Sequence, residues 1–220
     1  MPGRSRPVEP LERSELRRLR ALTRKSLRER RGAFLLEGFR AVETALERPG
    51  RADLLVLTPR ARDHERAPAL LAAAGELGIP VREAPEEDLT SLADTTAPSG
   101  IVARIRWDPP RDPSGQEAAE GLRRLGVRRL LCLDGVSDPG NAGTLLRTAD
   151  ALGITGALLG RGTVEAGNPK TARAAAGSLL RFDYLAEEVR LPAVLAALET
   201  GGWTVWRAES SGGERPEEEA

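Results

Sequence analysis

The feature that most constrains the fold is a short apolar run, residues 130–133, that leads directly into a glycine-rich loop. A run of four apolar residues is too short for a helix and predicts a buried strand, and the Asp134-Gly135 pair after it predicts a turn. The loop gives way to apolar residues at helical spacing, and a second strand is expected over residues 154–159. This strand, loop, helix and strand unit places the loop at the carboxyl end of a parallel sheet, where ligands bind in open α/β folds.

Two polar residues of this unit are candidates for function. Asn141 is predicted to be the N-cap of the helix, and Arg147 follows six residues later, nearly two turns on, so both can face one side of the loop. An alternative remains open for each residue. Asn141 can serve only as a cap, and an arginine on a surface helix is commonly solvated.

The same stretch, LDGVSDPGNAGTLLRTADALG, closely resembles the first signature motif of the SpoU/TrmH family of RNA ribose 2'-O-methyltransferases. The match is ungapped and includes Asp138-Pro139, Asn141, Gly143, Arg147, Thr148 and Gly153. The resemblance implies S-adenosylmethionine as the cofactor and a ribose 2'-hydroxyl of RNA as the methyl acceptor. It also implies catalytic roles for Asn141 and Arg147.

Two further segments carry the resemblance. Residues 168–177 resemble the family's second motif, in which Lys170 and Arg173 are expected to contact the substrate RNA, while Ala175 stands where the family often has serine. Near the start of the chain, FLLEGFRAVETAL resembles the substrate-binding domain of many SpoU enzymes, a fold akin to ribosomal RNA-binding proteins. This second likeness extends the expected RNA contacts to Arg40.

The order of the predicted elements gives an α/β protein with two domains. Residues 1–106 are expected to form a basic arm and a small α/β RNA-binding domain, and residues 107–121, rich in proline and glycine, a linker. Residues 122–208 are expected to form a parallel-sheet domain, with late strands over residues 180–185 and 203–208; the resemblance implies that this is an α/β-knot (SPOUT) methyltransferase domain. Residues 209–220 predict an acidic, disordered tail.

The family's third motif, a Gly-Ser/Asn-Glu-Gly loop followed by a Ser/Asn-rich segment, does not follow residue 208. In the family this segment threads the knot and supplies most of the cofactor pocket and much of the dimer packing. The resemblance therefore implies a methyltransferase domain that is incomplete at its C-terminus, cofactor loops beyond Ala220, and a homodimer when the chain is full length. The alternative is a non-catalytic RNA-binding protein or a truncated family member.

Charge is unevenly distributed, although 33 basic residues balance 33 acidic ones overall. Residues 1–31 are strongly basic, and residues 11–31 predict one helix. A basic arm favours a polyanion such as RNA, because neutralising phosphates releases counterions, and a solvated charged helix is the alternative. The resemblance points to ribosomal RNA, with transfer RNA left open.

Several classes of protein are disfavoured. One cysteine, Cys132, and one histidine, His64, cannot form a disulfide framework or a zinc cluster, so no metal is expected. No apolar run approaches 18 residues, which predicts a cytoplasmic enzyme with no membrane partner. The glycines after residue 159 do not form G-x-G-x-x-G, and no Gly-Lys-Ser/Thr occurs, which argues against dinucleotide and P-loop sites.

Overall fold

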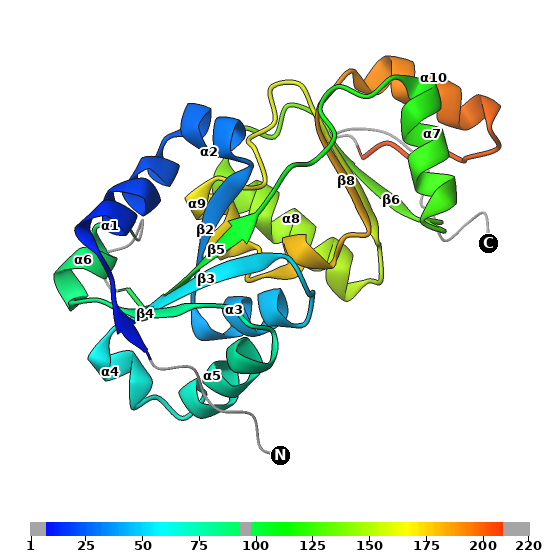
Figure 1. Cartoon of the computed structure of the whole chain (residues 1–220). Coiled ribbons are helices and arrows are strands. Elements are labelled where there is room, and N and C mark those ends of the chain that lie inside the picture. Colours follow the sequence, from blue (N-terminus) through cyan, green and yellow to red (C-terminus); the bar gives the residue numbers. More distant parts are fainter. Residues whose placement is uncertain (1–7, 93–97, 209–220) are drawn as a thin grey trace.

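The structure, a computed structural model, describes residues 8–92 and 98–208 and contains two sheets, one in each half of the chain (Figure 1). The first sheet has the strand order β1 (Glu9–Pro10), β4 (Val81–Glu83), β3 (Ala52–Leu57), β5 (Ile101–Arg106) and β2 (Ala33–Glu37). In this sheet β1, β4 and β3 are parallel, whereas β5 runs antiparallel to β3 and β2. The second sheet is wholly parallel, in the order β6 (Leu130–Leu133), β7 (Gly156–Gly160) and β8 (Tyr184–Val189). The expected mixed α/β architecture is confirmed.

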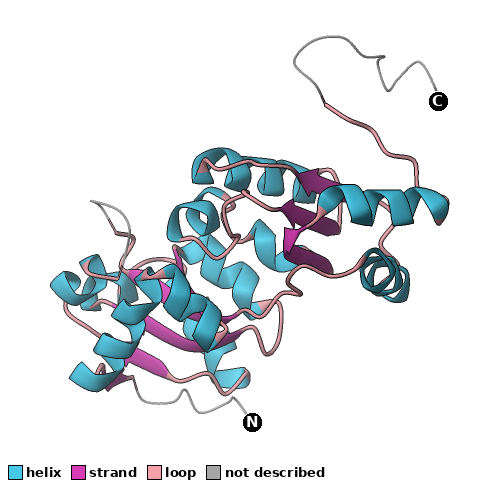
Figure 2. Ribbon diagram, turned by 90° about the horizontal axis from the view of Figure 1, so that it is seen from above, coloured by secondary structure: helices cyan, strands magenta, loops and turns pink. Residues whose placement is uncertain are grey.

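Helices cover both faces of the first sheet (Figure 2). They are α1 (Arg13–Arg20), the 3-10 helix η1 (Ala21–Thr23), α2 (Lys25–Arg31), α3 (Phe39–Leu46), α4 (Pro59–Arg62), α5 (Ala67–Glu76) and α6 (Glu86–Thr90). Successive side chains of β3 alternate between the faces: Leu54 packs with the α1 and α6 side, and Leu55 with the α3 and α5 side. The single helix expected over residues 11–31 is wrong, because the extended backbone of Arg24 separates η1 from α2.

The second sheet is also packed on both faces. Its helices are α7 (Gly115–Arg124), α8 (Pro139–Ala151), α9 (Pro169–Ala174), the 3-10 helix η2 (Ser178–Arg181) and α10 (Leu191–Thr200). On one face α7 and α10 pack against Leu158 of β7, and on the other α8 packs against its neighbour Leu159. The strand expected over residues 180–185 exists as β8, but it begins only at Tyr184, because residues 178–181 form η2. The strand expected over residues 203–208 is wrong, because these residues form no strand.

The expectation of a linker throughout residues 107–121 needs correction. Helix α7 begins at Gly115, and Ser114 and Glu117 form a reciprocal capping box at its start. The glycines of this segment are close-packing positions: a Cβ at Gly115 would lie 2.5 Å from Ala197 Cβ, and a Cβ at Gly121 would lie 2.6 Å from the Tyr184 ring. Only residues 107–114 therefore form an irregular connection.

One apolar core contains residues of both sheets, and each sheet has a second, separate core on its other face. Strand β2 lies at the edge of the first sheet, and it is covered by the segment that leads into α9, where a Cβ at Gly167 would lie 3.4 Å from Phe34. A Cβ at Gly177 would lie 3.1 Å from Ala41 Cα of α3. The edge strand is thus protected by the second half of the chain, and close backbone contact holds the two halves together. Of the helices described, none has the length and apolar character to cross a membrane.

Candidate active site

Helix α8 follows directly from the loop after β6, and its first turn is capped by Asp138. The Asp138 carboxylate accepts a hydrogen bond of 2.7 Å from the backbone N–H of Asn141, and Pro139 occupies the first helical position. The prediction that Asn141 is the N-cap is therefore wrong. Asn141 lies three positions into the helix, so its side chain is not used for capping.

Helix α9 is built in the same way and packs tightly on α8. The Asn168 side chain accepts a hydrogen bond of 2.9 Å from the Lys170 N–H, and Pro169 occupies the first helical position. At Gly143 of α8, an added Cβ would lie 2.6 Å from Ala174 Cβ of α9. The glycine is required for this close approach of the two helices.

The loops that follow β6 and β7 are joined at the carboxyl edge of the second sheet. Buried Thr163 donates a hydrogen bond of 2.9 Å to the Leu133 carbonyl and accepts one of 3.3 Å from the Val136 N–H. Gly135 and Gly162 have φ values of 65° and 82°, and an added Cβ at Gly135 would meet no atom within 4 Å. The edge therefore presents open backbone without side chains, which fits the close approach of a cofactor or nucleotide.

Arg147 lies on the side of α8 that faces α9. It is four residues after Gly143, and residues four apart share a helix face. Arg147 is exposed, and it has no hydrogen bond or ion pair to any residue in the described ranges. Its guanidinium is free to meet a ligand.

Asn141 is also exposed, but it does not share that face. Six residues of helix turn the direction of the side chain by about 120° and advance it by about 9 Å. The expectation that both residues face one side took six residues as nearly two turns, but the missing third of a turn separates the two side chains. The structure places Asn141 in the first turn, near the loop, and Arg147 beside α9.

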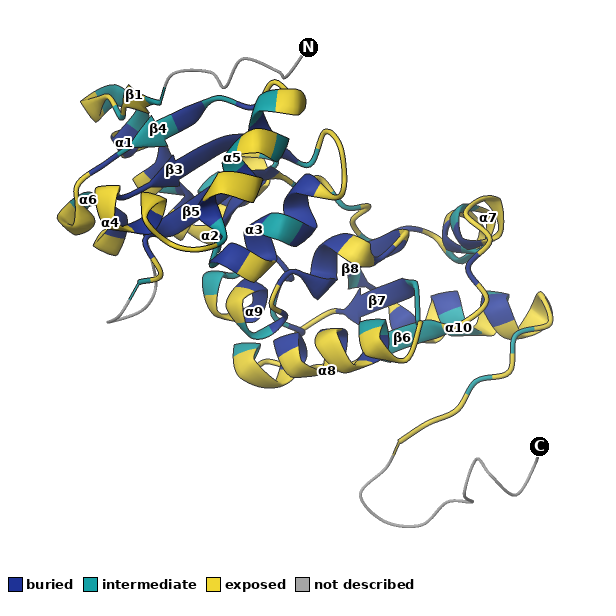
Figure 3. Cartoon of the chain, turned by 90° about the horizontal axis from the view of Figure 1, so that it is seen from below, coloured by how far each residue is buried: buried dark blue, intermediate teal, exposed yellow. Residues whose placement is uncertain are grey.

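The three residues expected to contact RNA, Arg40, Lys170 and Arg173, are all exposed. Arg40 lies in the first turn of α3, and its neighbour Ala41 contacts Gly177 just after α9. Lys170 and Arg173 belong to α9 itself. Figure 3 shows α3, α9 and α8 next to one another along one side of the molecule. The basic residues from both halves of the chain therefore line neighbouring helices, which we call the three-helix surface.

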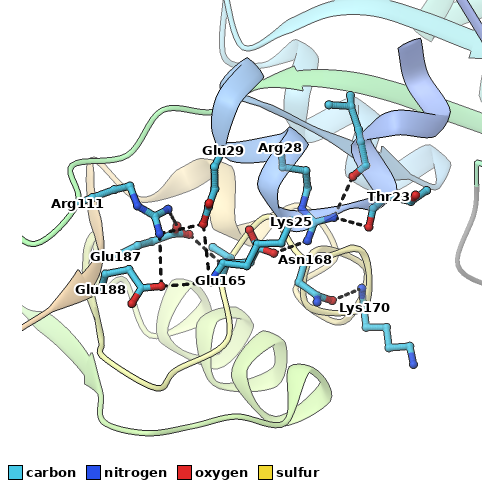
Figure 4. Close-up of polar contacts among 12 residues, drawn as sticks. Thr23, Lys25, Arg28, Glu29, Arg111, Glu165, Asn168, Lys170, Glu187 and Glu188 are labelled. Carbon is cyan, nitrogen blue, oxygen red and sulfur yellow. Dashed lines mark hydrogen bonds and ion pairs between the residues drawn. The ribbon is translucent and has the colours of Figure 1, made fainter. Parts of the chain in front are cut away.

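A buried polar network, which the sequence did not predict, joins α2, the loop before α9 and β8 (Figure 4). The buried Arg28 guanidinium pairs with the buried Glu165 carboxylate and donates to the carbonyls of Leu22 and Thr23, at 2.9 and 2.8 Å. In the sequence, Arg28 is only one of many basic residues within residues 1–31. No local signal reveals the pair, because its partners are 137 residues apart in sequence.

The network continues through β8. Glu187 accepts a hydrogen bond of 2.9 Å from the Ala166 N–H and forms an ion pair with Arg111 at 3.2 Å. Burial raises the pKa of the Glu187 carboxyl, while the Ala166 hydrogen bond and the Arg111 charge lower it. Arg111 also pairs with Glu29 of α2 at 3.0 Å. The loop before α9 is thereby fixed to both β8 and α2.

Cys132, the single cysteine of the chain, lies in β6 and is a poor candidate for a nucleophile. Burial raises the pKa of the Cys132 thiol to about 11, so the thiol is protonated and a poor nucleophile at neutral pH. Within residues 8–92 and 98–208, no three His, Cys, Asp or Glu side chains are grouped to hold a metal ion. His64 is exposed and stacks on Phe39 at 3.9 Å between ring centroids.

Comparison with known proteins gives matches in both halves of the chain. Residues 13–103 match the MRM3-like substrate binding domain, and residues 128–220 match the SpoU rRNA Methylase family. The chain is 31% identical over 199 residues to the 23S rRNA (guanosine(2553)-2'-O)-methyltransferase RlmP of Bacillus subtilis, covering 90% of this chain and 71% of that protein. It is 30% identical over 148 residues to the 23S rRNA (guanosine-2'-O-)-methyltransferase RlmB of Acinetobacter baylyi, covering 67% of this chain and 59% of that protein.

Solved structures agree with these matches. The AdoMet-bound rRNA methyltransferase from Sinorhizobium meliloti superimposes with a TM-score of 0.65 at 25% identity, covering 87% of this chain and 67% of that chain. On these grounds the chain belongs to the SpoU rRNA methylase family.

Proposed function

We propose that this chain transfers a methyl group from S-adenosylmethionine to a ribose 2'-hydroxyl of ribosomal RNA. Support comes from the family membership and from relatives that are named as 23S rRNA 2'-O-methyltransferases. The observation that carries the proposal is the three-helix surface, where helices with exposed basic side chains from both halves of the chain pack next to α8, the helix that follows the loop after β6. An RNA held by the first half would thus reach the reacting edge of the second.

Arg147 is proposed to hold the phosphate next to the reacting ribose. An arginine guanidinium stays protonated in proteins, so Arg147 is unsuited to remove the proton of the hydroxyl. A planar fork can instead grip a phosphate through two hydrogen bonds, and its charge stabilises the alkoxide that develops on the ribose oxygen. Asn141 is proposed to position the ribose or the loop from the first turn of α8.

The remaining basic residues of the site are proposed to bind RNA phosphates. These are Arg40, Lys170 and Arg173, each of them exposed on its helix. When bound, S-adenosylmethionine supplies an electrophilic methyl group, and the open loops at Gly135 and Gly162 would hold part of it. The contribution of the chain is alignment of the acceptor, for which well-oriented reactions gain about 7–11 kcal/mol.

We further propose the organisation in which the enzyme works. Residues 1–106 would bind substrate RNA and residues 122–208 would perform catalysis, in the cytoplasm and as a homodimer. Leu145 of α8 and Leu152 at its C-cap support the dimer, since they are 40% and 62% exposed and lie seven residues apart on one side of the helix. Sedimentation equilibrium would test this: a Leu145→Asp, Leu152→Asp variant should be monomeric, and a wild-type monomer would contradict the dimer.

The activity itself is tested with methyl-tritiated S-adenosylmethionine and 23S ribosomal RNA transcribed in vitro. We expect label in the RNA that remains after alkaline hydrolysis as dinucleotides, because a 2'-O-methyl group blocks cleavage of the adjacent phosphodiester. The competing function is RNA binding without catalysis. It would be supported by tight RNA binding together with no label and no uptake of the cofactor in calorimetry.

A further inference from the structure

A second basic site lies in the first half of the chain, away from the three-helix surface. It is a cavity of about 840 Å³ between the end of α2, the turn before β3 and the end of β5. We call it the arginine cleft. It is lined chiefly by Arg18, Arg31, Arg51, Arg104, Arg106 and Trp107.

The positive charge of the arginine cleft is only partly compensated. Asp53 is fully engaged, since its two carboxylate oxygens pair with Arg104 at 2.6 Å and Arg106 at 3.2 Å. The side chains of Arg18, Arg31 and Arg51 form no ion pair with any carboxylate of the described chain. Asp108, the other acidic residue of the lining, pairs with none of these arginines, and Arg31 also donates a hydrogen bond of 2.8 Å to the Arg18 carbonyl. Five arginines against two carboxylates leave the cavity with a net positive charge that suits an anion.

Arg51 is held in place by an aromatic ring and not by an acid. Its guanidinium carbon lies 5.6 Å from the centre of the Trp107 ring, which is itself fixed by an edge-on contact with Phe34 at 5.6 Å. Burial, together with the positive charge of Arg48, lowers the pKa of Arg51. A guanidinium that is half-buried without a counterion is stabilised by a bound anion.

The arginine cleft and the candidate active site lie at opposite ends of strand β2. Ala33 pairs with Arg106 at the cleft end, whereas Glu37 pairs with Val102 at the end that leads into α3 and Arg40. Four residues of strand span about 13 Å. An RNA chain that occupies both sites must extend over several nucleotides, because phosphates repeat every few ångströms along a strand.

We propose that the arginine cleft binds the phosphate backbone of the RNA substrate at a point remote from the methylated ribose. The proposal rests on the proposed function for the identity of the RNA. Phosphate suits the cleft better than a base edge, since the free groups are guanidinium forks and the Trp107 ring is already covered by Arg51. The cleft would add affinity and fix the orientation of the RNA.

The test is a matched pair of charge-removing variants. Arg31→Gln with Arg51→Gln removes two charges from the cleft, and Arg123→Gln with Arg124→Gln removes two from exposed positions on α7. Binding to 23S ribosomal RNA transcribed in vitro is measured by filter retention over a series of NaCl concentrations. We expect the cleft variant to bind about tenfold more weakly, with a salt slope lower by roughly 1.5, since each lost phosphate contact removes about 0.7–0.9 from the slope.

The control variant should stay within about twofold of the wild type. A single Arg18→Gln variant, at an exposed position, guards against a folding defect and should weaken binding by about threefold. A cleft variant with the affinity and salt slope of the control would overturn the proposal. Methyl transfer at saturating RNA separates the two claims. If the cleft variant binds RNA more weakly while the wild-type protein transfers no methyl group, the cleft is supported and the proposed activity is refuted.

Discussion

Removing the Glu165 carboxylate should destabilise the protein far more than removing a surface carboxylate. In Glu165→Ala the Arg28 guanidinium stays buried, at 6% exposure, with its charge uncompensated and only the Leu22 and Thr23 carbonyls as partners. Breaking one side of a buried ion pair costs about 3–5 kcal/mol. The loss should also loosen the contact between α2 and the loop before α9.

The assay is urea unfolding followed by circular dichroism, with Glu47→Ala as the matched control. Glu47 pairs with Arg181 at 3.3 Å, but both side chains are substantially exposed, so its removal should cost less than about 1 kcal/mol. Replacing both partners, as Arg28→Leu with Glu165→Leu, should recover much of the lost stability, because no buried charge is left. Equal costs for Glu165→Ala and Glu47→Ala would refute the reasoning.

Three further predictions concern single positions. Cys132 should react with a disulfide reagent about a hundredfold more slowly in folded protein than in urea at pH 8, because its pKa rises from 9.0 to about 11; equal rates would contradict its burial. The pKa of Glu187 is raised in the folded protein, so the stability that its protonated form contributes is present below pH 4.5 and is lost as the pH rises through the folded pKa. A Glu187→Gln variant cannot lose this proton, and its free energy of unfolding should therefore increase relative to that of the wild type above pH 4.5. Gly143→Ala should cost about 1–3 kcal/mol in urea unfolding through its clash with Ala174, whereas Gly75→Ala, which meets nothing within 4 Å, should be neutral or stabilising.

Local chemistry in the sequence predicted most elements of the site region. The run at residues 130–133 is β6 as expected, and Asn168-Pro169, an acceptor side chain before a proline, starts α9. The same reasoning would have identified Asp138-Pro139 as the start of α8, because an acceptor side chain before a proline suits the cap and first helical positions. Asn141 was a plausible cap by residue type, but the preceding proline had already begun the helix.

Contacts between distant residues could not be predicted. Residues 203–208 have the composition of a strand but no paired neighbour in the part of the chain that is described, and β-propensity alone does not make a strand. The glycines at 115 and 121 suggested flexibility, whereas they permit close packing on α10 and β8. Burial of Arg28 against Glu165 depends on the docking of the two halves, which no local pattern encodes.

The most direct test of the account is the turnover of an Arg147→Lys variant. Lysine keeps the charge but loses the planar fork, so methyl transfer to 23S ribosomal RNA should fall by about a hundredfold or more, while the dissociation constant for RNA stays within about twofold of the wild type. Arg124→Lys on α7 serves as the control and should retain full turnover. Undiminished turnover of Arg147→Lys would contradict the role of the guanidinium at the reacting ribose.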